Sequence, residues 1–466
     1  MPDALSAASG APFAAADSAT AGSLKRLAIR GAIWTMFGFG ASHVLRLGFN
    51  LIVTRLLYPE LFGLISLVFT IVSGLTFFCD LGITPAVVRD PRGGEPAFLN
   101  TAWTMQIMRG IAISAGCLLL AWPVSRFYAD HRLLWIVPVI GLSNIGLGFN
   151  STSLFTLKRN MQVRPLVIME VGTQILSGTI MVVWAWLSPT IWALIAGTLS
   201  STVIRLAWSH LLHRGASDRL AWEPAVVREL LRFGRWIWIS SILAFLASQI
   251  DRLILGRLIT WQMLGIYAIA AAIAEVPRGL TMALNSGVIF PAYARSLHLG
   301  RAELRARIIR HRWRLLVVMA LGIAGLTVLG DGIVRFLYDK RYAAGAWMLP
   351  LLALGIWPSA LASTIDSSLT AIGQPRYAAS ANLYKILFTA IGLPVGFRLM
   401  GTAGAVLVVA MNDLPYYGQI AYGVWREGLS SWAQDLKATA LLLAIIGLAL
   451  MARSALGFGI PFRGPF

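Results

Sequence analysis

Apolar residues occur along this chain in long blocks that are separated by short polar segments. Each block holds about twenty residues, the length of helix that crosses the hydrocarbon core of a bilayer. The pattern therefore predicts an all-α polytopic membrane protein with 12–14 transmembrane helices, of which thirteen can be marked. We place them at roughly 31–54, 61–83, 98–122, 133–157, 165–187, 190–211, 235–256, 263–290, 315–337, 346–370, 378–399, 402–424 and 437–457.

One part of this pattern occurs twice. Residues 30–65 recur at 232–267 with an offset of 202, so that Trp34 matches Trp236, Leu56 matches Leu258 and Gly63 matches Gly265. Each copy is a long apolar stretch, a short Arg-Leu turn, and a second apolar stretch that begins near the glycine. Two similar halves that rock about a central site provide alternating access, so the repeat favours a carrier. A duplicated fold that no longer transports is the alternative.

The repeat also predicts how the chain is organised. Two pseudo-symmetric six-helix bundles should enclose a central cleft that is lined by the first two spans of each bundle. We expect a disordered cytoplasmic tail at 1–27, an N-terminal bundle at 28–211, a cytoplasmic loop at 212–234, a C-terminal bundle at 235–424, and an extra span with its tail at 425–466.

Composition supports the membrane assignment, and charge adds an orientation. Mean hydropathy is +0.72 and 13% of the residues are charged, whereas about a quarter are charged in soluble domains. The net charge of +19 lies mostly between the apolar blocks. Positive-inside topology and attraction to anionic lipids explain this placement better than nucleic acid does. With the N-terminus in the cytoplasm, the inside segments carry more than twice as many basic residues as the outside loops.

Several short segments resemble a known family. The first-hairpin turn resembles that of the polysaccharide transporters, the oligosaccharide flippases of the MOP exporter superfamily, and other segments follow in the same order. The matching segments are Thr54–Leu64, Asp80–Arg89, Phe233–Gly234, Gln249–Arg257, Leu264–Tyr267, Phe290–Tyr293 and Ala371–Arg376.

This resemblance implies a substrate and a location. Such proteins move undecaprenyl-pyrophosphate-linked sugar repeat units from the cytoplasmic to the periplasmic leaflet of the bacterial inner membrane. It also implies a glycan polymerase and chain-length regulators as partners, and no cofactor. The thirteenth span departs from the commoner even counts, which leaves the side of the C-terminus open.

Basic residues inside the apolar blocks are candidates for binding such a substrate. The pyrophosphate requires cations, and Arg binds phosphate oxygens with two donors at once. A charge at mid-bilayer is costly, so these side chains should face a cavity or a partner. Structural ion pairs are the competing interpretation, and Arg205 near a span end is expected to extend to the membrane surface instead. The candidates are Arg46, Arg109, Arg278 and Lys385. Arg46 and Arg278 are favoured, because they lie on the first hairpins of the two bundles, which face each other across one cleft in the fold that the resemblance implies.

Carboxylates in the same blocks are candidates for coupling transport to protons or sodium. Glu275 lies three residues before Arg278, so the two share a helix face and can pair. Asp251 precedes Arg252 near a span end, a placement typical of a structural feature. The coupling candidates are Asp366, Asp413, Glu275 and Asp80.

Two other functions remain open. A multidrug or small-cation exporter of the same superfamily would favour carboxylates and aromatic residues over arginines. A glycan polymerase or ligase would need a large outside loop with catalytic groups, and the six histidines form no cluster that would suit a metal or a base. No nucleotide-binding glycine loop of the Walker type occurs.

Overall fold

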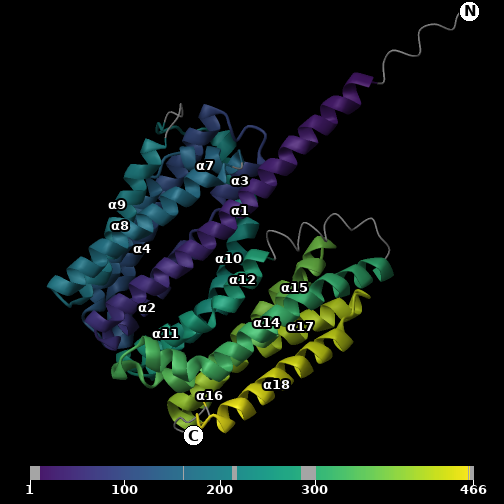
Figure 1. Cartoon of the computed structure of the whole chain (residues 1–466). Coiled ribbons are helices and arrows are strands. Elements are labelled where there is room, and N and C mark those ends of the chain that lie inside the picture. Colours follow the sequence, from purple (N-terminus) through teal and green to yellow (C-terminus); the bar gives the residue numbers. More distant parts are fainter. Residues whose placement is uncertain (1–10, 161, 213–217, 285–300, 460, 462–466) are drawn as a thin grey trace, which may run out of the picture.

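A computed structural model describes residues 11–160, 162–212, 218–284, 301–459 and 461 (Figure 1). Within these ranges the chain is almost entirely helical and has no β-strand. The helices are α1 (Ala11–Leu56), α2 (Pro59–Phe78), α3 (Ile83–Arg89), α4 (Pro96–Tyr128), α5 (Leu133–Gly141), α6 (Ser143–Gly148), α7 (Ser153–Arg159), α8 (Val163–Leu187), α9 (Ile191–Leu211), α10 (Pro224–Leu258), α11 (Trp261–Ala274), α12 (Val276–Leu284), α14 (Arg301–Leu337), the 3-10 turn η2 (Lys340–Tyr342), α15 (Gly345–Ala371), α16 (Arg376–Met411), α17 (Asp413–Arg426) and α18 (Trp432–Ala455).

The length and composition of these helices confirm a polytopic membrane protein. In the described ranges nine helices are long and apolar enough to cross a membrane, or up to eleven if each bent pair is one span. The run 376–426 counts as one of the nine. It contains non-helical residues at Met400 and Gly401, and Gly401 has a φ of 61°, which glycine adopts without strain. The thirteen spans and the two six-helix bundles stay predictions.

Three helices extend beyond their expected ends. Helix α1 begins at Ala11, inside the 1–27 segment expected to be disordered, and the alanines there favour a helix. Helix α10 begins at Pro224, inside the expected 212–234 loop. Helix α14 is continuous over 301–337, so it begins before the expected start of its span at 315. Residues 1–10 and the Phe290–Tyr293 motif lie outside the described residues.

The helices run between two ends of the molecule, which we name after a residue at each. At the Tyr58 end the chain turns near residues 57–58, 129–132, 188–190, 259–260, 338–344 and 400–401. At the Asp80 end it turns near residues 79–95, 149–160, 212, 218–223, 372–375 and 427–431. The sequence predicts that the Asp80 end faces the cytoplasm, because the basic segments lie there.

One apolar core fills the Tyr58 end and belongs to both halves of the chain. It joins Leu57, Leu64 and Leu133 of the first half to Leu264 and Tyr342 of the second. Burying such side chains against each other contributes about 1.5–3 kcal/mol each in water, and in lipid the same close packing provides dispersion contacts instead. The two halves are therefore tightly joined at this end.

The matched glycines of the repeat lie against each other in this core. A Cβ added to Gly63 would lie 1.9 Å from the carbonyl oxygen of Trp261, and one added to Gly265 would lie 1.9 Å from the carbonyl oxygen of Pro59. Pro59 and Trp261 are also 202 residues apart. Helices α2 and α11 thus cross in a nearly two-fold contact that only glycine allows on either side.

At the Asp80 end the cores are separate. One contains Ile83 and Phe98 of the first half together with Leu230 in the first turns of α10. Two others, around Ile323 of α14 and Ile365 of α15, lie in the second half. Figure 1 shows the same division: the ribbons of α1–α9 and α14–α18 meet near α2 and α11 and diverge toward the end from which the N-terminus emerges.

Candidate functional site

A cluster of buried charges lies in the second half of the chain. Asp413 is its centre: its Oδ1 accepts a hydrogen bond of 2.6 Å from the Nζ of Lys385, and its Oδ2 accepts one from the guanidinium of Arg278. Arg278 also contacts the Oε1 of Glu275 at 3.1 Å. The side chains of Lys385 and Asp413 are 8% and 4% exposed, so these charges neutralise each other away from water.

Breaks in two helices position this cluster. Helices α11 and α12 meet at Glu275 with a bend of 43°, and Pro277 removes a backbone donor just beyond the bend. Helices α16 and α17 meet at Asn412. Each break brings charged side chains into an otherwise apolar layer at the point where helical packing is interrupted.

The cavity beside this cluster is small, with a volume of about 50 Å³. Tyr267, which is fully buried, donates a hydrogen bond from its hydroxyl to Asp251 there. Three cations and three carboxylates line it: Arg252, Arg278, Lys385, Asp251, Glu275 and Asp413. The cavity is balanced in charge, and its volume suits a few water molecules rather than a pyrophosphate.

Arg46 lies in a different place. It lines a cavity of about 570 Å³ within the first half of the chain, between α1, α2, α6, α8 and α9. Its lining contains no carboxylate from the part of the chain that the structure describes, and its polar wall includes Asn50, Gln174, Thr198 and Ser201. Amides and hydroxyls that both donate and accept hydrogen bonds are suited to sugar hydroxyls.

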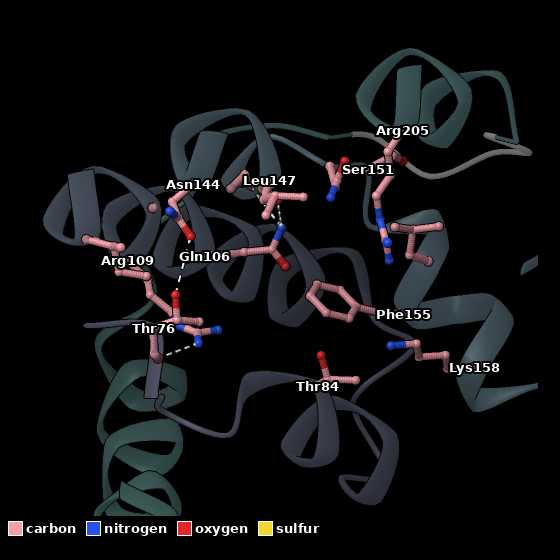
Figure 2. A pocket seen from close by; sticks show the side chains of 15 residues that line it. Thr76, Thr84, Gln106, Arg109, Asn144, Leu147, Ser151, Phe155, Lys158 and Arg205 are labelled. Atoms are coloured by element: carbon pink, nitrogen blue, oxygen red, sulfur yellow. Dashed lines mark hydrogen bonds between the residues drawn. The ribbon is translucent and has the colours of Figure 1, made fainter. Parts of the chain in front are cut away.

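Arg109 lines a third cavity, of about 200 Å³, near the Asp80 end of the first half (Figure 2). Its Nη2 donates to the backbone oxygen of Thr76 at 2.9 Å and lies 3.9 Å from the Oδ1 of Asp80. Asp80 also accepts hydrogen bonds from Gly82 and from Ser241 of α10. Asp80 thus connects the two halves of the chain rather than facing an empty cavity.

Asp366 of α15 is the coupling candidate that forms no ion pair with any of the described residues. Its Oδ2 accepts a hydrogen bond of 3.3 Å from the hydroxyl of Tyr416, and its Oδ1 is buried without a hydrogen-bond partner there. A carboxylate without a cation can be neutralised by a proton without leaving a positive charge unpaired.

The structure therefore groups the predicted residues differently from the sequence. Arg278, Lys385, Glu275 and Asp413 form one cluster, although the sequence assigns them to two roles. Arg46 and Arg278, expected to face one cleft, line separate cavities.

Sequence reasoning missed three contributors. Asp251 belongs to the charge cluster, but its position beside Arg252 near a span end is typical of a structural feature, so its contact with Tyr267 was not predicted. Lys158 and Arg205 line the cavity of Arg109, but their positions near span ends favour an extension to the membrane surface. No group of three or more potential metal ligands occurs within the described ranges.

The chain matches known proteins over most of its length. A family model described as "Polysaccharide biosynthesis protein" matches residues 52–347. The chain is 24% identical over 324 residues to the succinoglycan biosynthesis transport protein ExoT of Rhizobium meliloti (strain 1021), which covers 69% of this chain and 65% of that protein. It is 21% identical over 408 residues to the lipopolysaccharide biosynthesis protein WzxC of Escherichia coli (strain K12), covering 85% and 81%.

The fold is similar to that of solved transporters. The lipid II flippase MurJ in an inward closed conformation superposes with a TM-score of 0.68 at 13% identity, covering 91% of this chain and 93% of that one. An inward-facing multidrug resistance MATE family transporter of the MOP superfamily superposes with a TM-score of 0.66 at 11% identity, covering 83% and 94%. At these identities the likeness shows the fold alone.

Proposed function

The chain belongs to the polysaccharide biosynthesis protein family and is a multi-pass membrane transporter rather than an enzyme, and we propose that it is a flippase for lipid-linked oligosaccharides. It moves undecaprenyl-pyrophosphate-linked repeat units from the cytoplasmic to the periplasmic leaflet, for exopolysaccharide, capsule or O-antigen synthesis. The membrane is the bacterial inner membrane, and the Asp80 end and the N-terminus face the cytoplasm.

One observation carries this proposal: a single apolar core joins the two halves at the Tyr58 end, whereas at the Asp80 end the first turns of α10 pack on the first half and two further cores lie in the second half alone. A carrier that rocks about a joined end gives a substrate access from the divided end. In this arrangement a substrate enters from the cytoplasmic side, which is the side on which lipid-linked repeat units are assembled.

The cavities supply the two kinds of contact that the substrate needs. The polar wall around Arg46 supports binding of the sugars, and Arg109 supports binding of the pyrophosphate. Arg278 and Lys385 act on the substrate only when rocking separates them from Asp413, because each is paired in the present state. They are therefore residues whose partners change between the two states.

The charge cluster and Asp366 support coupling to an ion gradient. Asp413 and Glu275 hold cations in the present state, whereas Asp366 accepts only the hydrogen bond from Tyr416. Proton binding at Asp366 is the coupling step that disturbs the fewest ion pairs. Asp366→Asn should therefore keep the fold and lose the dependence of transport on the proton gradient.

Deletion of the gene in the source bacterium tests the function for any glycan that the pathway builds. We expect loss of a surface polysaccharide and accumulation of its undecaprenyl-pyrophosphate-linked repeat unit, measured by mass spectrometry of extracted lipids. The wild-type gene should restore both. An unchanged surface polysaccharide with no accumulated lipid-linked unit would contradict the proposal, and increased sensitivity to organic cations in the same strain would favour a drug exporter instead.

A further inference from the structure

The cavity of Arg109 contains two more cations that its sequence neighbourhood does not reveal. Lys158 at the end of α7 and Arg205 in α9 line it together with Arg109 of α4. In Figure 2 the side chains of Lys158 and Arg205 extend toward the same space beside Phe155. Three helices distant in the sequence thus place three positive charges around a single cavity of about 200 Å³.

Among the described residues, no carboxylate lines this cavity. The acidic neighbours are outside it: Asp80 lies 3.9 Å from Arg109, and Glu170, whose side chain is 56% exposed, contacts Arg205 at 3.1 Å. The ammonium group of Lys158 forms no ion pair with any of the described residues. The cavity therefore has an excess of positive charge, unlike the balanced cavity around Asp413.

Buried donors inside this region also lack partners. The Nε atoms of Arg109 and Arg205 are buried and have no hydrogen-bond acceptor within the described part of the chain. An unsatisfied buried donor of a charged group is costly, and guanidinium groups satisfy their donors best with the paired oxygens of phosphates or carboxylates. Hydroxyls of Thr84 and Ser151 complete the lining on the opposite walls.

The cavity also adjoins the larger one. Arg205 and Leu147 line both this cavity and the 570 Å³ cavity that contains Arg46. Arg205 therefore lies between a small, strongly cationic space and a large space lined by amides and hydroxyls. A ligand with an anionic group next to a sugar would place one part in each.

We propose that Arg109, Lys158 and Arg205 form the binding site for the diphosphate of the lipid-linked substrate, with its first sugars in the adjoining cavity. This inference rests on the proposed function and names its anion site, which differs from the Arg46 and Arg278 pair that the sequence favours. A diphosphate carries at least two negative charges and several acceptor oxygens, and the site supplies three cations within one cavity.

Binding of soluble diphosphates to the purified full-length protein tests this site. Inorganic pyrophosphate and farnesyl diphosphate are titrated calorimetrically into wild type, Lys158→Gln, Arg205→Gln and the double variant. We expect each single change to weaken binding of both probes roughly tenfold or more, because a hydrogen bond to a charged group contributes about 1.5–3 kcal/mol. Arg205→Lys should restore part of the affinity, since it keeps the charge but loses the paired donors.

Arg426→Gln is the matched control, because Arg426 is an exposed cation at the same end of the molecule and lines none of the three cavities. It should leave the affinity unchanged. Thermal melting of each variant separates lost binding from lost folding. A double variant that melts as wild type does and still binds pyrophosphate with wild-type affinity would overturn the site, as would a wild-type protein that binds neither probe.

Phosphatidylglycerol added to the titration distinguishes the source of the phosphate. If it competes as well as farnesyl diphosphate, the cavity is a membrane-phospholipid site and the assignment to the substrate is wrong. The deletion experiment remains independent of this result. If lipid-linked units accumulate in the deletion strain but the double variant binds pyrophosphate as wild type does, this site alone is rejected. If binding of pyrophosphate depends on Arg205 but no lipid-linked unit accumulates in the deletion strain, the flippase function alone is rejected.

Discussion

The Tyr58 end and the Asp80 end are formed by the same helices, but different contacts hold the two halves together at each. At the Tyr58 end a shared apolar core, the Gly63–Gly265 crossing and an edge-to-face contact between the rings of Phe62 and Tyr342 join them. At the Asp80 end the contacts between halves are made mostly by α10, through a smaller apolar core that includes Leu230 and through polar contacts such as the ion pair between Arg92 and Glu229, whose side chains are 44% and 40% exposed.

This difference indicates which end moves first. Close packing and dry contacts are lost abruptly when helices separate, whereas exposed polar contacts exchange readily with water. The Asp80 end can therefore open or close at little cost while the Tyr58 end stays joined. In the proposed rocking cycle, opening at the Tyr58 end is the costly half, and the proposed ion gradient would drive it.

The largest expected effect is at the glycine crossing. Gly63→Ala or Gly265→Ala places a methyl group 1.9 Å from a backbone oxygen, so α2 and α11 must separate at a cost of about 1–3 kcal/mol or more. We expect a clearly lower melting temperature and loss of polysaccharide export. Gly447→Ala, whose added Cβ would have no atom within 4 Å, should melt as wild type does. Equal melting of all three variants would show that the crossing is not a tight contact.

The next effect concerns Arg341, which connects the second half to the first at the Tyr58 end. Its Nη2 donates to the backbone oxygen of Arg55 at 2.9 Å, at the end of α1, and its guanidinium lies 5.1 Å from the ring of Tyr58. Cations stabilise helix C-termini, so Arg341→Ala should lower stability by about 1 kcal/mol. The neighbouring Lys340→Ala serves as control and should have no effect in the same thermal melts.

A smaller effect is expected from the exposed ion pair at the Asp80 end. Glu229→Gln removes the partner of Arg92, but solvent already screens this pair. The variant should melt and export polysaccharide as wild type does. A loss of stability comparable to that of Gly63→Ala would mean that the Asp80 end is held as tightly as the Tyr58 end, which would remove the contrast between the two.

The smallest effect is a pH dependence at the Tyr58 end. The hydrogen bond from Arg341 lowers the pKa of Asp339 below its ordinary value. Because the pKa is lower in the folded protein, this stabilisation is present above the ordinary Asp pKa of about 3.9 and is lost as the pH falls below it. Asp339→Asn should therefore melt below wild type at pH 6, and the difference should shrink toward pH 3. A difference that is constant with pH would exclude this carboxylate.

The sequence predicts the fold better than it predicts the site. Apolar blocks report membrane spans directly, and the offset of 202 finds Gly63 and Gly265, which the structure brings into contact. Intramembrane charges are equally visible, because their cost makes them rare. The pair of Glu275 and Arg278, predicted from helical spacing, lies at 3.1 Å in the structure.

What the sequence could not supply is the partner of each charge. Arg278 and Asp413 are 135 residues apart, and only the tertiary fold brings their side chains together. Lys158 and Arg205 lie near span ends, where an extension to the membrane surface is the ordinary interpretation. Their common cavity depends on how α7 and α9 pack, which no local pattern encodes.

A reversible cross-link at the Tyr58 end tests most directly whether the halves must separate there during transport. In a background of Cys79→Ser and Cys117→Ala, the pair Tyr58→Cys and Arg341→Cys is joined across the halves with a cleavable thiol-specific linker. The pair Glu60→Cys and Arg132→Cys, whose native side chains contact each other at 2.8 Å within the first half, is the control. Surface polysaccharide is measured before linking, after linking and after reduction.

We expect the link between the halves to stop export and reduction to restore it, while the link within the first half leaves export unchanged. Continued export with the two halves fully linked at the Tyr58 end would contradict a rocking carrier.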